Sequence, residues 1–174
     1  AYKHLELRSL SYEALSTWKM NADLVTQLLG LRTGRQRSPS EKEFALRFAD
    51  LCLEAEEIEE TVDLLTIDDL LSQPAVNIEL ERYEPIFRAL LGLETPSVRL
   101  DEEAIVQAVS LLIKKSARSR PICLRVDELS KLSRQTRKYL YRVIDTLSSV
   151  PVLVLLGGRK LESLTLGLGV DSIR

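Results

Sequence analysis

The chain has 174 residues, of which 45% are hydrophobic and 29% are charged, and its formal net charge is −2. This composition excludes a disordered chain and suffices for one sizeable core, or for a helical domain with a small appendage. Two cysteines and one histidine are too few for a zinc site, and no stretch approaches the roughly 20 apolar residues of a membrane-spanning helix. Because no signal peptide is recognised, we expect an intracellular protein, cytoplasmic or nuclear, with buried free thiols and no cofactor.

The charge is distributed unevenly along the chain. Residues 1–40 carry six Lys/Arg and three Asp/Glu, residues 41–111 carry five and eighteen, and residues 112–174 carry thirteen and five. This asymmetry suggests that the basic part contacts nucleic acid and that the acidic part meets a different partner. The alternative is two solvated faces that differ in sign. We predict an acidic helical assembly region at residues 1–98 and a basic domain at residues 99–174.

The first region begins ambiguously and then becomes helical. Residues 2–10 alternate weakly between apolar and polar, as in a short strand, and residues 11–30 have the apolar spacing of a helix that ends at Gly30. A clear helix start follows, because Ser38 and Glu41 have the spacing of a capping box and Pro39 occupies the first helical position.

The helix that follows this capping box carries a heptad seam. Its apolar residues are spaced alternately four and three apart for three repeats, and its outer face is rich in glutamate. This pattern predicts lengthwise packing on other helices, either of the same chain or of a protein partner or second copy. The residues through which association would occur are Phe44, Phe48, Leu51, Ile58 and Val62.

Shorter helices are predicted between this seam and the basic domain. One starts near residue 66 and stops at Pro74, and another runs from Asn77 to Leu91 with a break or kink at Pro85. A third covers residues 101–116, with acidic residues in its first turn and basic residues near its end, as the helix dipole favours.

The basic domain is predicted to contain both strands and helices. Residues 122–126 have the pattern of a short strand, and two short helices follow, the second reaching residue 147 with Ser133 as its cap. Residues 150–156 and 161–166 are predicted strands joined by a Gly-Gly-Arg-Lys turn. A single helix over residues 127–147 is the alternative, because the connection before Ser133 is shorter than the usual turn of about three to four residues.

The order helix, strand, helix, helix, strand, basic turn, strand over residues 101–168 resembles a winged helix-turn-helix domain. In that family the second central helix lies in the major groove of DNA and the wing touches the backbone or the minor groove. The resemblance implies that nucleic acid is contacted by Arg134, Gln135, Arg137, Lys138 and Arg142 of the helix and by Arg159 and Lys160 of the wing.

Motifs for catalysis are missing from this sequence. The segment that ends at Asp127 and Glu128 superficially resembles the acidic strand end of an ATPase, but no glycine-rich phosphate loop accompanies it and Arg125 interrupts the strand. Its acid pairs are also compatible with a metal-dependent nuclease, although carboxylates are favoured at helix starts without any catalytic role. With one histidine near a terminus, no Ser-His or Cys-His arrangement is expected, and we predict a protein that is not an enzyme.

The predicted fold class is therefore mainly α with some strand (α+β): a helical bundle followed by a winged-helix-like unit with a C-terminal β-hairpin. The predicted function is non-catalytic binding of nucleic acid, in the form of double-stranded DNA, with assembly through the acidic helices. The alternative is a scaffold or assembly subunit of a replication, repair or transcription complex that acts through protein–protein contacts. Neither function involves a membrane.

Overall fold

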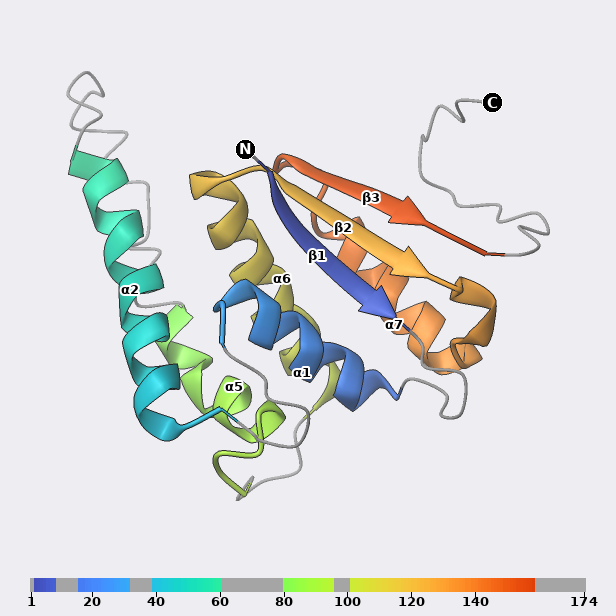
Figure 1. Cartoon of the computed structure of the whole chain (residues 1–174), viewed down its shortest axis with the longest axis horizontal. Coiled ribbons are helices and arrows are strands. Elements are labelled where there is room, and N and C mark those ends of the chain that lie inside the picture. The colour runs from blue at the N-terminus through green and yellow to red at the C-terminus, as the bar shows by residue number, and fades with distance from the viewer. Residues whose placement is uncertain (1, 9–15, 32–38, 61–79, 96–100, 159–174) are drawn as a thin grey trace.

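The computed structural model describes residues 2–8, 16–31, 39–60, 80–95 and 101–158, with the backbone alone at Arg8 and residues 53–60. The predicted mainly helical α+β class is confirmed (Figure 1). In chain order the elements are β1 (Lys3–Arg8), α1 (Thr17–Leu28), α2 (Glu41–Glu60), α5 (Glu84–Leu90), α6 (Glu102–Ser119), β2 (Ile122–Asp127), the 3₁₀ turn η1 (Leu129–Lys131), α7 (Arg134–Asp145) and β3 (Val152–Leu156).

The described strands form one parallel sheet in the order β1-β2-β3 (Figure 1). β1 runs beside β2 from Lys3 opposite Ile122, and β2 runs beside β3 from Ile122 opposite Val152. Parallel neighbours need a crossover connection, and η1 with α7 supplies the one between β2 and β3. β1, from the region predicted to be an acidic assembly region, shares this sheet and one hydrophobic cluster with β2, from the predicted basic domain.

The surroundings of β3 differ from those predicted for a hairpin. The strand is present where it was expected, at Val152–Leu156, but it pairs in parallel with β2. Residues 161–166, the predicted second strand of the hairpin, lie outside the described residues. Periodicity identifies a strand without identifying its neighbours, because long-range packing chooses them. The alternative of one helix over residues 127–147 is wrong, since η1 and α7 are separate.

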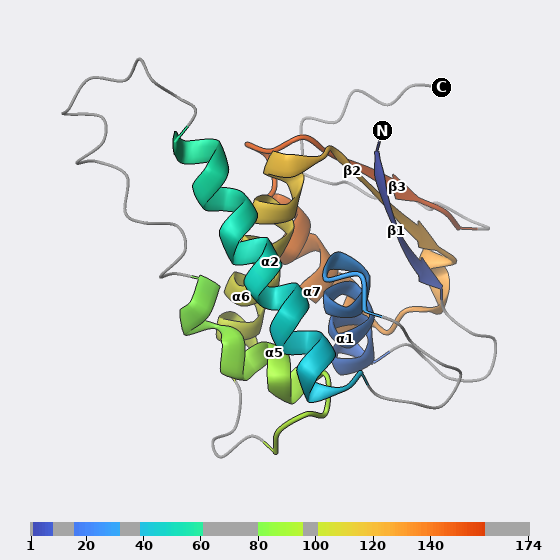
Figure 2. The same cartoon turned by 60° about the vertical axis from the view of Figure 1, so that its left-hand side comes forward.

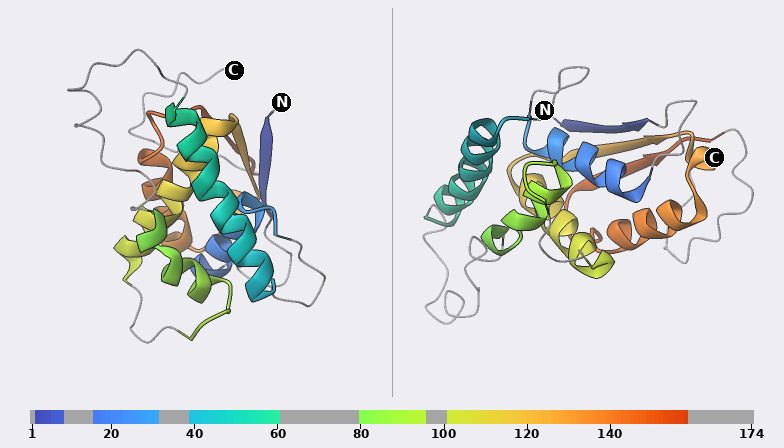
Figure 3. Two further views of the ribbon diagram at one scale, coloured as in Figure 1. Left: turned by 90° about the vertical axis from the view of Figure 1, so that its left-hand side faces the viewer. Right: turned by 90° about the horizontal axis from the view of Figure 1, so that it is seen from below.

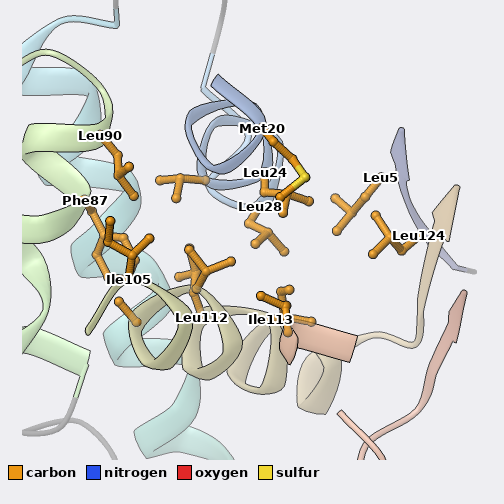
Figure 4. Packing of buried hydrophobic residues seen from close by; sticks show 14 of the residues in the cluster. Leu5, Met20, Leu24, Leu28, Phe87, Leu90, Ile105, Leu112, Ile113 and Leu124 are labelled. Atoms are coloured by element: carbon orange, nitrogen blue, oxygen red, sulfur yellow. The ribbon is translucent and has the colours of Figure 1, made fainter. Parts of the chain in front are cut away.

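Helices α1, α6 and α7 cover one face of the sheet (Figure 3, right). Leu5 of β1 and Leu124 of β2 point from the sheet toward Met20 and Leu24 of α1 and toward Ile113 of α6 (Figure 4). Each of these five side chains is at most 1% exposed. Burying one large aliphatic side chain contributes roughly 1.5–3 kcal/mol, so this contact is a main source of stability for the fold.

Helices α2 and α5 extend the helical layer on the side away from β3 (Figure 2). α2 begins two residues later than the predicted capping box, because the Ser40 hydroxyl accepts a hydrogen bond from the Glu43 N–H at 3.2 Å. Ser40 and Glu43 repeat the same spacing, and Ser38 lies outside the described residues. The predicted break near Pro85 is present, because a turn at Tyr83 separates the helical residues 80–82 from α5. Pro85 itself lies in the first turn of α5, where a backbone N–H would have no partner in the helix.

The described part of the heptad seam packs inside the protein. The Phe44 and Phe48 rings are stacked with centroids 5.5 Å apart, and the centroid of Phe48 lies 5.9 Å from that of Phe87 in α5. The Arg88 guanidinium lies 5.2 Å from the Phe44 centroid, which adds a cation–π contact. Leu51 is half-buried, and the side chains of Ile58 and Val62 lie outside the described residues.

Replacing Phe44 with Ala removes a fully buried ring from this cluster. We expect the free energy of unfolding to fall by about 3–5 kcal/mol because a cavity replaces the ring. Leu46→Ala on the same helix is the control, since Leu46 is 57% exposed and its loss should change stability by less than about 0.5 kcal/mol. Urea unfolding followed by circular dichroism measures both variants. Equal losses would contradict the inward placement of the seam.

Candidate functional site

The helix that was predicted to contact DNA is α7, which begins beside the carboxyl ends of the strands (Figure 1). Ser133 caps it as predicted, since its hydroxyl accepts a hydrogen bond from the Thr136 N–H at 3.0 Å. Arg134, Gln135 and Lys138 are exposed on the first two turns. These three predicted contact residues therefore lie on one exposed end of one helix.

The cations of α7 differ in whether they have an acidic partner. Arg142 is bound by the start of α6, where it donates to the Glu102 carboxylate at 3.0 Å and to the Glu103 carboxylate. Arg134 and Lys138 have no acidic partner within the described part of the chain. On α7, Arg134 and Lys138 are thus the exposed cations that no acid in the described part of the chain neutralises.

The other predicted contact residues contribute less to this surface. Arg137 is half-buried, and its Nε atom is buried without a hydrogen-bond partner among the described residues. Arg159 and Lys160, the predicted wing contacts, lie outside the described residues. The structure therefore brings together three of the seven predicted contact residues.

A polar contact joins α7 to α1, and local hydrogen bonds surround it. The hydroxyl oxygens of Thr17 and Thr136 lie 3.4 Å apart, and the Thr136 hydroxyl lies 2.8 Å from that of Ser133. One turn further along, Asn21 and Tyr139 are fully buried, and the Asn21 amide donates to the Thr17 carbonyl at 2.9 Å. The burial of Tyr139, Leu140 and Val143 places this side of α7 against the core, so the opposite side faces outward.

Burial strongly perturbs the acid–base behaviour of this helix. Desolvation raises the pKa of Tyr139 well above its ordinary value of 10.0, and Asn21 and the Arg142 charge oppose the rise only in part. Burial also raises the pKa of Tyr141, against the charge of Arg137. Both phenols therefore ionise only at a higher pH than a solvent-exposed tyrosine does.

Tyr139 predicts a loss of stability at alkaline pH. Above about pH 10 the unfolded chain ionises this hydroxyl while the folded protein keeps it protonated, so the free energy of unfolding falls by up to about 1.4 kcal/mol per pH unit. Tyr139→Phe should remove this part of the slope, whereas Tyr2→Phe, at a 70% exposed position, should leave it intact. Urea unfolding at a series of pH values tests this, and identical slopes in all three proteins would contradict it.

The acid pair Asp127 and Glu128 ends the central strand, β2. Arg125 Nε donates to Asp127 Oδ1 at 2.9 Å, and Lys131 forms an ion pair with Glu128. Glu128 has a left-handed backbone with φ 56° and ψ 49°, which costs roughly 1–3 kcal/mol. Both acids are thus engaged in the turn that leads from β2 toward α7. Within the described chain, no group of three or more His, Cys, Asp or Glu side chains could hold a metal ion.

A second candidate surface is the face of the sheet opposite the helices. Side chains alternate along a strand, and the exposed Leu153 and Leu155 of β3 alternate with the less exposed Val152, Val154 and Leu156, so they lie on the face away from the helical layer. They are 59% and 47% exposed, and no described helix covers them. Parallel sheets are normally covered on both faces. Cys123, a half-buried free thiol, is the β2 residue opposite Leu153.

β3 also lies at an edge of the described sheet, although its composition is that of an interior strand. It reads Val-Leu-Val-Leu-Leu, a continuous apolar run, whereas the other edge strand, β1, alternates as Lys-His-Leu-Glu-Leu-Arg. Natural edge strands are usually protected by a charge, a proline or a bulge, and Val152–Leu156 has no charge and no proline. Sequence reasoning missed this surface because the signal appears only once the position of β3 in the sheet is known.

None of the helices in the described part of the chain is long and apolar enough to cross a membrane. Comparisons of the sequence with protein families and with curated proteins, and of the structure with solved structures, find no match. The surfaces of α7 and β3 are therefore the basis on which a function can be argued.

Proposed function

We propose that the protein is an assembly subunit in which a second copy of the chain extends the sheet at the edge of β3. One observation carries this proposal: β3 has the composition of an interior strand but lies uncovered at an edge of the described sheet. An exposed apolar edge strand is a template for pairing with another strand.

The sequence of β3 suits pairing with its own copy. In an antiparallel pair centred on Val154, Leu153 of one copy lies opposite Leu155 of the other. Every cross-strand pair in this arrangement is apolar, so no like charges face each other. A twofold axis relates the two copies, and the assembly therefore closes as a dimer rather than growing into a filament.

The heptad seam is less suited to association than the edge of β3. Its described aromatic residues, Phe44 and Phe48, are at most 5% exposed because they pack on α5 and on the core of their own chain. An interface through them would require the helical layer to open. The proposed assembly surface is consequently the sheet rather than the acidic helix that the sequence indicated.

The affinity of such a dimer should be modest. Cross-strand side-chain pairs contribute roughly 0.2–1 kcal/mol each, and association costs at least about 4 kcal/mol in lost freedom of motion. Backbone hydrogen bonds and the burial of the exposed leucines must supply the difference. We expect a dissociation constant in the range of about 1–100 μM.

A charge-swap experiment tests this dimer. The double variants L153K/L155K and L153E/L155E place like charges opposite each other in the pair and should be monomeric, whereas an equimolar mixture should form heterodimers. Both leucines are exposed, so the core is not disturbed. Sedimentation velocity at increasing protein concentration measures the fraction of dimer.

Leu46→Lys is a control for the lysine variant, because it places one lysine at an exposed leucine of α2, away from β3, and should leave the dimer intact. A wild-type chain that stays monomeric at every concentration would overturn the proposal. So would an L153K/L155K variant that dimerises like the wild type.

A second candidate function, binding of duplex nucleic acid, is favoured by a different observation. Arg134, Gln135 and Lys138 are exposed together, and no acid in the described part of the chain neutralises the two cations. Cations displayed in this way can neutralise phosphates. Because Arg142 is held by two glutamates, the contact surface proposed here is smaller than the one that the resemblance implied.

Salt dependence tests this second candidate. Each phosphate contact contributes about 0.9 to the slope of log affinity against log salt concentration, so R134A/K138A should lower the slope by nearly two units and weaken binding to all duplexes alike. R118A/R120A is the control, since it removes two exposed cations elsewhere. Fluorescence anisotropy with a short duplex at several salt concentrations measures the slopes. Affinity that does not change with salt, or a slope unaltered in R134A/K138A, would contradict the assignment.

A further inference from the structure

A hollow of about 260 Å³ lies between α6, the end of α7 and the segment that precedes α5. It shares no residue with the exposed end of α7 or with the sheet face. Its lining residues are Arg82, Tyr83, Gln107, Ser110, Leu111, Lys114 and Thr146.

The hollow is built by segments that are distant in sequence. Gln107, Ser110 and Lys114 follow one another at spacings of three and four along α6 and therefore lie on one side of that helix. Arg82 and Tyr83 approach from the turn before α5, and the Tyr83 hydroxyl donates to Gln107 Oε1 at 3.2 Å. This hydrogen bond fixes one wall of the hollow.

Two cations and no acid line the hollow. Arg82 and Lys114 have no acidic partner among the residues that the structure describes. The arginines on the neighbouring helices behave differently, since Arg88 and Arg142 each bind two glutamates. The nearby carboxylate of Glu103 is already bonded to Arg142 and to Gln107. An anionic ligand would complete the charge pairing at this place.

A buried hydroxyl provides a second, independent observation. Ser110 is 4% exposed, and its Oγ atom has no hydrogen-bond partner within the described chain. Buried polar groups in folded proteins are almost always hydrogen-bonded, so this hydroxyl lacks a partner that a ligand oxygen could supply.

We propose that this hollow binds a small phosphate-bearing ligand. Arg82 and Lys114 pair with its oxygens, because guanidinium and ammonium groups form the strongest hydrogen bonds with phosphate. The Ser110 hydroxyl adds a neutral donor. Pockets for larger organic ligands measure roughly 300–1,000 Å³, so the hollow accommodates a phosphate group with at most a small organic substituent.

Titration of the full chain with inorganic phosphate, followed by amide NMR at constant ionic strength in chloride, tests the site. We expect saturable shifts at Gln107, Ser110, Lys114 and Thr146. R82Q and K114Q should each weaken phosphate binding by roughly tenfold, as the loss of a charge-assisted hydrogen bond does. K114R keeps the charge and should retain most of the affinity, and Ser110→Ala should weaken binding less than either glutamine variant.

Arg118→Gln is the matched control, because Arg118 is an exposed cation one turn beyond Lys114 on the same helix and does not line the hollow. R134A/K138A should also bind phosphate normally, which separates this site from the surface of α7. The proposal is overturned if the shifts do not saturate, if acetate at the same ionic strength produces the same saturation, or if the exposed-site variant R82Q binds phosphate like the wild type.

Discussion

The packing of Leu5 and Leu124 on α1 and α6 is the contact on which the rest of the structure depends. It draws β1, from the beginning of the chain, and β2, from the basic third, into adjacent places in one sheet. Pairing these two strands closes the long stretch of chain that connects them, which costs conformational entropy. The burial of many apolar side chains offsets this cost. Because α6 turns its apolar side to this core, Gln107 and Lys114 are left on its other side.

Local patterns predicted the elements better than their arrangement. The cap at Ser133, the strand around Leu124 and the helix that became α6 were predicted because each depends on neighbours in sequence. The parallel sheet was not predicted, since strand pairing is decided by residues far apart. The burial of Tyr139 does not follow from the local sequence either, because α7 packs on the sheet and on two other helices and therefore buries a wide part of its circumference.

In the candidate site on α7, some features also follow from the local sequence, whereas others depend on residues that are far apart in the chain. The exposure of Arg134 and Lys138 follows from the helical periodicity around the buried Leu140. The ion pairs of Arg142 do not, because Glu102 and Glu103 are supplied by a helix some forty positions earlier. A count of charges along the sequence treats every Lys and Arg as available for binding. Folding brings some of these cations into ion pairs with acids of distant helices. The basic third therefore presents fewer free cations than its composition indicates.

The leucines of β3 are informative because the core does not need them. Leu153 and Leu155 face away from the helices, and the matching positions of β1, the other edge strand, are the polar residues His4 and Glu6. Single exposed leucines are ordinary on protein surfaces and require no explanation. Two on one face of an uncharged strand are different here, because no described strand pairs with the outer edge of β3, whose backbone groups can pair with another strand. Exposed side chains and an edge that no described strand pairs with occur at one place, and together they support the proposal that the sheet continues in an assembly.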